Sequence, residues 1–156
     1  RSTLFPYTTL FRSLELINLL VSSRYLVGRK MLRERAISFL QAHRLDAVIV
    51  DVHIVGRTKI KMLNEQIGHQ GTTDVLSFPQ YDSQEENFSL PPGVPRHLGD
   101  IVISFPEAIK QARKRGKLVD EQLWVYLEHG LLHLLGYHHE DDAQKTTIIP
   151  QKPLKF

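Results

Sequence analysis

Apolar residues recur at helical spacing in four stretches of the chain, and three short runs rich in β-branched residues lie between these stretches. The helical spacing predicts amphipathic helices at residues 29–43, 57–66, 106–115 and 120–135. The apolar runs predict strands at residues 47–54, 74–78 and 98–104. Elements in this order predict one α+β domain in which helices pack on a small mixed β-sheet, and the order of the strands is left open.

Turn-forming and capping residues separate these elements. Pro106 occupies a helix-opening position, and Asp120 is the predicted N-cap of the last helix. Residues 68–73 contain two glycines and are expected to form a loop. Residues 81–97 contain three prolines, and we expect a long surface loop there.

The two ends of the chain do not fit this pattern. Residues 3–13 (TLFPYTTLFRS) resemble the conceptual translation of a DNA-sequencing adapter, so residues 1–13 are interpreted as a non-native artefact. Residues 144–156 contain two prolines, cannot continue a helix and are expected to be a truncated or damaged tail. The expected domain therefore comprises residues 14–143.

Composition narrows the chemistry that such a domain can perform. The chain has 156 residues and no cysteine, so disulfides and thiolate metal sites are excluded, and a transition metal must be held by histidines and carboxylates. No apolar run is long enough to span a membrane, and a cytoplasmic location is expected.

Charge does not by itself indicate a nucleic-acid partner. The net charge is +3, but residues 1–13 and 144–156 hold five basic and no acidic residues. The remaining residues hold 15 basic and 17 acidic side chains, a net charge of −2. The excess of basic residues lies in the two ends of the chain, so it does not indicate that the domain binds nucleic acid.

Two histidines in the last predicted helix form the best candidate metal site. His129 and His133 are four residues apart, which stacks their rings on one helix face. The pair alone fits two ordinary helix histidines equally well. A third ligand from His138 or His139 requires the helix to end and the chain to fold back, and Gly136 stands where this can happen. Spacing does not separate His138 from His139, and three histidines with an open position are typical of a catalytic metal.

The residues around this pair refine the interpretation. In zinc peptidases with an HExxH motif a glutamate follows the first histidine, but here Gly130 does, so that mechanism is not supported. A glycine inside a helix suggests close approach of a strand, either 98–104 or 74–78, although an exposed and tolerated glycine is the alternative. The acidic run 140–142 either orients a ligand histidine or is simply solvated.

The segment from His129 to His139 (HGLLHLLGYHH) resembles the HGxLHLxGYxH signature of the YbeY family, bacterial metal-dependent endoribonucleases that mature ribosomal RNA. Residues 63–64 (LN), 73–79 (TDVLSFP) and 98–103 (LGDIVI) are similar to further motifs of that family, in the same order. The resemblance covers about residues 29–142.

The resemblance implies one zinc ion per chain, bound by His129, His133 and His139. It also implies cleavage of single-stranded RNA in the maturation of ribosomal RNA and in ribosome quality control, with ribosomal proteins or an assembly GTPase as further partners. Two departures concern the site: His138 replaces an aspartate, and residues 67–69 (IGH) lack an arginine that many members carry, leaving His69 as a candidate RNA contact.

A basic stretch on and after the third predicted helix is a second candidate for RNA contact. Its five charges could engage phosphates, although a solvated helix end favoured by the helix dipole explains them equally well. The five residues are Lys110, Arg113, Lys114, Arg115 and Lys117. The alternative function is a ribosome- or GTPase-binding assembly factor whose metal is mainly structural.

Overall fold

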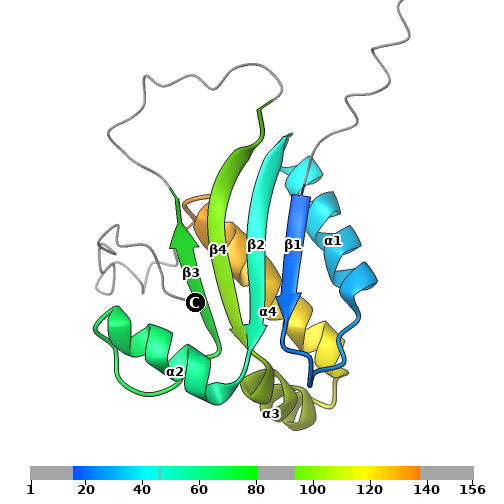
Figure 1. Cartoon of the computed structure of the whole chain (residues 1–156). Helices are drawn as coiled ribbons and strands as arrows, with labels where there is room; N and C mark the ends of the chain where they lie inside the picture. The colour runs from blue at the N-terminus through cyan, green and yellow to red at the C-terminus, as the bar shows by residue number, and fades with distance from the viewer. Residues whose placement is uncertain (1–15, 46, 81–93, 138–156) are drawn as a thin grey trace, which may run out of the picture.

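The computed structural model describes residues 16–45, 47–80 and 94–137. Four strands and four helices follow one another along this part of the chain (Figure 1). In order they are β1 (Leu16–Val21), α1 (Arg29–Ala42), β2 (Val48–Val55), α2 (Arg57–Gln66), β3 (Val75–Pro79), β4 (Arg96–Ser104), α3 (Phe105–Arg115) and α4 (Val119–Leu134).

The four strands form one mixed sheet in the order β1-β2-β4-β3. β1, β2 and β4 are parallel, and β3 pairs antiparallel with β4 at the edge of the sheet. The predicted α+β class with a small mixed sheet is therefore confirmed. The pairing of β2 with β4 shifts register between Ile49 and Val50, which marks a β-bulge.

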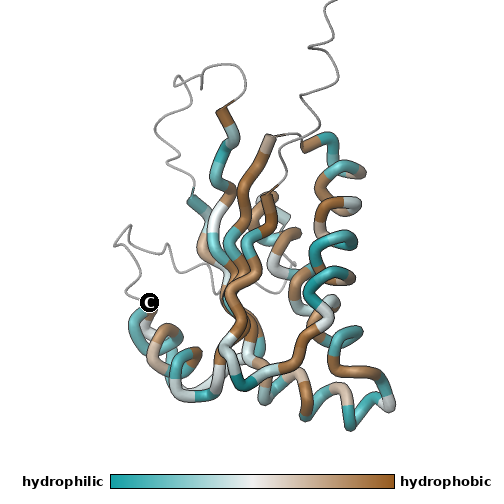
Figure 2. Tube along the Cα trace, turned by 45° about the vertical axis from the view of Figure 1, so that its right-hand side comes forward, coloured by the Kyte–Doolittle hydropathy of each residue, from teal (hydrophilic) through white to brown (hydrophobic). Residues whose placement is uncertain are grey.

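Helices cover the two faces of the sheet unequally. The main core lies between one face and helices α1 and α4, where the alternate residues Val48, Val50, Val52 and Ile54 of β2 are buried. On the other face, α2 packs over β3 and β4 and forms a small separate core that includes Ile60 and Val102. Figure 2 shows that hydrophobic residues dominate the central strands, whereas hydrophobic and hydrophilic residues alternate along the helices.

Strand β1 was absent from the elements predicted from the pattern. Its alternate residues Ile17 and Leu19 are buried, but the opposite face carries the exposed Leu16 and Leu20. Because both faces are largely apolar, the run shows little of the apolar–polar alternation that identifies a strand. It also begins three residues after segment 1–13, which is interpreted as a non-native artefact.

Two boundary predictions were wrong. Residues 96 and 97 were assigned to the loop 81–97, but they belong to β4, where pairing with β2 extends the strand. Asp120 does not cap α4, since Leu118 is the N-cap residue. The Asp120 carboxylate instead accepts a hydrogen bond of 3.1 Å from the Gly28 N–H, at the start of α1. The Asp120 side chain thus makes a contact between two helices that are distant in sequence, and it does not cap its own helix.

No helix in the described parts of the chain combines the length and the apolar character that crossing a bilayer requires.

Candidate metal centre

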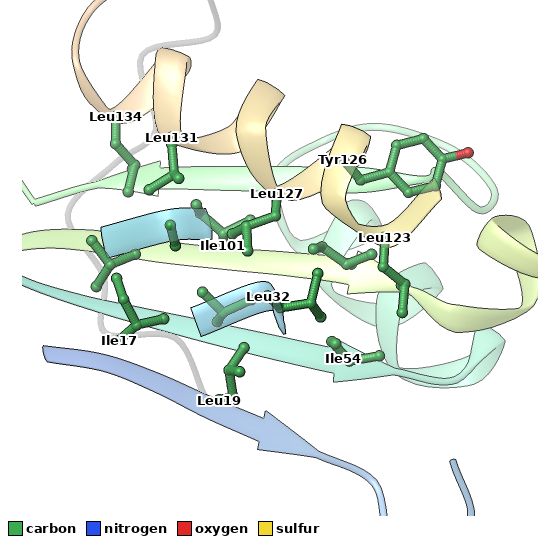
Figure 3. Packing of buried hydrophobic residues seen from close by; sticks show 14 of the residues in the cluster. Ile17, Leu19, Leu32, Ile54, Ile101, Leu123, Tyr126, Leu127, Leu131 and Leu134 are labelled. Atoms are coloured by element: carbon green, nitrogen blue, oxygen red, sulfur yellow. The ribbon is translucent and has the colours of Figure 1, made fainter. Parts of the chain in front are cut away.

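Helix α4 and strand β4 approach each other closely where two glycines lie. Gly130 is buried, and a Cβ atom there would lie 2.7 Å from Cγ2 of Ile101. On β4, a Cβ atom at Gly99 would lie 2.9 Å from Cδ2 of Leu134. Figure 3 shows Ile101 under α4, beside Leu127 and Leu131. The prediction that a strand packs against Gly130 is confirmed for 98–104, and the exposed-glycine alternative is wrong.

This packing holds the histidine-bearing turns of α4 in a fixed position on the sheet. Leu131 and Leu134 are fully buried against the core, while Leu132 and Leu135 are partly buried. His129 and His133 are half-buried, so they stand on the part of the helix that is not inserted into the core.

The two imidazole rings of this pair converge. Their Nε2 atoms are 2.9 Å apart, and the ring centroids are 4.4 Å apart at an interplanar angle of 69°. Zinc–nitrogen bonds of about 2.0–2.1 Å at a tetrahedral angle would place two Nε2 atoms about 3.3 Å apart. A small rotation of either ring reaches that spacing, so the pair fits two ligands of one ion. A hydrogen bond between one protonated and one unprotonated Nε2 also fits the distance.

The chain turns directly after this pair, as predicted. Gly136 has φ +84°, the left-handed conformation that ends helices. The Gly136 and Tyr137 N–H groups donate 3.0 Å hydrogen bonds to the carbonyl oxygens of His133 and Leu132. His138, His139 and the acidic run 140–142 lie outside the described residues, so the third ligand stays a prediction.

Tyr126 lies one turn before His129 on the buried side of α4. Burial raises the pKa of its hydroxyl above the ordinary value, and the negative charge of Asp74 raises it further. The hydroxyl therefore stays protonated at neutral pH.

The predicted RNA contacts on α3 lie apart from the histidine pair. Figure 1 shows α3 at the end of the sheet where α4 begins, whereas His129 and His133 occupy the last two turns of α4. All five basic residues are exposed, and Lys110 is 3.5 Å from a carboxylate oxygen of Glu107. The five are Lys110, Arg113, Lys114, Arg115 and Lys117. His69 is exposed, and its backbone N–H donates a 3.1 Å hydrogen bond to the carbonyl oxygen of Asn64.

A second group that could hold a metal ion was missed from the sequence. One ligand atom each from Asp51, His97 and Asp100 lies within 4.8 Å of the others. His97 Nε2 is 2.8 Å from Asp51 Oδ2, and His53 Nε2 is 3.2 Å from Asp100 Oδ1. These side chains alternate with core residues of β2 and β4, so they occupy the face of the sheet opposite α4.

The sequence gives only a weak indication of the group formed by Asp51, His97 and Asp100. Polar Asp51 and His53 alternate with valines and isoleucine in a run that otherwise reads as a buried strand. His97 and Asp100, however, share a face only because of the bulge between β2 and β4. A bulge cannot be read from spacing.

Comparison with known proteins agrees with the motifs and with the fold. A model of the family described as Endoribonuclease YbeY matches residues 27–152. An Endoribonuclease YbeY of Anaeromyxobacter sp. (strain Fw109-5) is 44% identical over 128 residues, which cover 79% of this chain and 62% of that protein. One of Dehalococcoides mccartyi (strain CBDB1) is 36% identical over 149 residues, which cover 89% of each chain. The chain thus spans less than two thirds of the first relative and most of the second.

A solved structure is similar in fold. The solution structure of a protein from Thermotoga maritima is 28% identical, has a TM-score of 0.54 and covers 83% of this chain and 78% of its own. With its motifs, its fold and a family match over most of its length, this chain belongs to the YbeY family of endoribonucleases.

Proposed function

We propose that this chain is a zinc-dependent endoribonuclease that cuts single-stranded RNA in the maturation of ribosomal RNA and in ribosome quality control. The observation that carries the proposal is the convergence of the His129 and His133 Nε2 atoms at 2.9 Å in a chain of an endoribonuclease family. Residues 14–143 form the proposed catalytic domain, and the cytoplasm is its proposed location.

In this proposal His129, His133 and His139 hold one zinc ion per chain. The donor set suits zinc, since imidazole is a common ligand of this borderline metal and the chain has no cysteine. When bound, zinc would polarise a phosphoryl oxygen or lower the pKa of water toward about 7.

The described residues serve this site by positioning it. The contact of Gly130 with Ile101 sets the distance of α4 from the sheet, and the left-handed Gly136 ends the helix one turn after His133. Gly130 also leaves no carboxylate at the position after the first histidine. Any proton transfer to or from the substrate must therefore involve another group than the glutamate of HExxH enzymes.

The proposed substrate is single-stranded ribosomal RNA, and ribosomal proteins or an assembly GTPase are proposed further partners. His69 and the basic residues of α3 remain proposed RNA contacts.

An RNA-cleavage assay tests the proposal. The zinc-loaded chain should cut a single-stranded RNA, and His133→Ala should abolish cleavage, because it removes one of two converging imidazoles. Glu34→Ala is the control, because Glu34 is exposed on α1 and its carboxylate lies 3.9 Å from Lys30 Nζ. If the zinc-loaded chain leaves RNA intact, the proposed activity is wrong.

Metal removal separates the two functions considered. Loss of cleavage on chelation, with circular dichroism unchanged, is expected for a catalytic metal. Unfolding on chelation would instead favour the assembly factor with a structural metal, since α4 carries much of the core and its last turns bear the histidine pair.

A further inference from the structure

A cleft lies at the carboxyl ends of β1 and β2. The chain leaves β1 toward α1 on one face of the sheet and leaves β2 toward α2 on the other face. In open sheets, ligands bind in the crevice where consecutive connections diverge to opposite faces. The cleft has a volume of about 680 Å³, and its lining comes from the end of β1, the residues after it, the end of β2 and the first turn of α2.

The cleft is positively charged. Arg24, Arg57 and Lys59 line it, and none of the described lining residues is acidic. Arg24 and Arg57 are exposed, and Lys59 is partly buried. Helix α2 begins here at Arg57 with no side-chain cap and no acidic residue in its first turn. The positive end of the helix dipole therefore adds to the three side-chain charges.

Aromatic and apolar surface lies beside these charges. The Tyr25 ring stacks on the Phe105 ring with centroids 4.3 Å apart and an interplanar angle of 19°. The Arg24 guanidinium carbon lies 6.0 Å from the centroid of the Tyr25 ring. Leu20, another lining residue, is 52% exposed. Cations next to flat apolar surface are the combination by which proteins hold single-stranded nucleic acids.

We propose that this cleft binds backbone phosphates of single-stranded RNA, as an anchoring subsite separate from the histidine pair. The inference rests on the RNA substrate proposed above. The cleft opens at the carboxyl ends of β1 and β2, whereas the histidine pair lies in the last turns of α4, which pack on β3 and β4. The cleft therefore governs RNA affinity and leaves the chemistry at the metal unchanged.

Two triple variants with equal loss of charge test the cleft. One carries Arg24→Gln, Arg57→Gln and Lys59→Gln. The other carries Lys30→Gln, Arg33→Gln and Arg44→Gln, three exposed residues on and directly after α1 that do not line the cleft. Binding of the zinc-loaded full chain to a labelled, 2′-O-methylated single-stranded oligonucleotide of about 12 nucleotides is followed by fluorescence anisotropy between about 50 and 200 mM salt. The 2′-O-methyl groups prevent cleavage and leave the phosphates in place.

The cleft variant should lower the slope of log affinity against log salt by about 2, because each phosphate contact to a single strand contributes about 0.7. At 0.1 M salt this corresponds to a loss of affinity of up to about 100-fold. The α1 variant should retain most of the affinity. Arg57→Gln alone should produce about a third of the change in slope, which keeps the test valid if the triple variant does not fold.

Three results would overturn the inference. These are unchanged binding by the cleft variants, equal losses in the cleft and α1 variants, and binding of adenosine monophosphate as tight as that of the oligonucleotide. The last result would identify a nucleotide pocket. Failure of the proposed function looks different, since a zinc-loaded wild-type chain would then leave unmodified RNA uncut whether or not the cleft binds it.

Discussion

Replacing Gly130 by alanine is expected to destabilise the protein. In an exposed helix the same change would stabilise by about 1 kcal/mol, because alanine has the higher helix propensity. Here the new methyl group would lie 2.7 Å from Ile101 Cγ2 and 3.0 Å from its Cδ1. Ile101 is fully buried and branched at Cβ, so its Cγ2 atom cannot rotate away without displacing core neighbours.

The magnitude follows from these opposing terms. Overpacking a well-packed core costs about 1–3 kcal/mol, and the gain in helix propensity offsets about 1 kcal/mol of this. We expect a net loss of about 1 kcal/mol, and at most about 2 kcal/mol, in the free energy of unfolding. Zinc affinity should fall as well, since a shift of α4 moves His129 and His133 with it.

Denaturant unfolding of the metal-free chain and zinc titration measure the two effects. A double-mutant cycle supplies the control, because Ile101→Ala removes all three atoms nearest to the added methyl. Gly130→Ala should therefore cost less in the Ile101→Ala background and keep its full cost in the Ile103→Ala background. A stabilised Gly130→Ala variant with normal zinc affinity would refute the close-packing argument.

Further predictions concern other parts of the chain. Gly99→Ala should lower the melting temperature strongly in a thermal scan, because φ is +143° and a Cβ atom there would collide with the Phe78 carbonyl oxygen; an unchanged melting temperature would contradict this. Arg35 donates two 3.0 Å hydrogen bonds to Glu121 and holds the pKa of that carboxyl below its ordinary value. The ion pair stabilises the fold at pH values above the unfolded-state pKa of Glu121, and this stabilisation is lost as the pH falls through the folded-state pKa. Arg35→Ala should therefore lower the free energy of unfolding slightly at about pH 7 and not at about pH 2. An equal loss of stability at both pH values would exclude the ion pair as the cause of the loss. Deleting residues 1–13 should leave the melting temperature unchanged, and a clear drop would show that they pack on the domain.

The elements that local pattern determines were predictable from the sequence. Helix α2 was predicted with its observed bounds, 57–66, because its apolar spacing is regular and glycines flank it. The helical histidine pair was likewise visible, since a separation of four residues fixes a shared face. The contact of Gly130 with a strand could be predicted because glycine destabilises a helix interior, so its presence there suggests that another element approaches the backbone closely.

Features that depend on contacts between distant residues were not predictable. The strand order β1-β2-β4-β3 follows from pairing across the whole domain. Asp51 and His97 are 46 residues apart in sequence and meet only through the pairing of β2 with β4. The basic cleft likewise combines residues from the segment after β1 and the start of α2, which lie far apart along the chain.

The zinc content of purified single variants tests the central claim most directly. Elemental analysis should find one zinc equivalent in the wild-type chain, with loss of zinc in His133→Ala and in His139→Ala. His138→Ala should retain zinc, and so should Asp51→Asn, which disrupts the other group that could hold a metal. Loss of zinc in His138→Ala but not in His139→Ala would correct the third ligand and leave the site in place. A His133→Ala variant that still holds one equivalent with unchanged affinity would contradict the account.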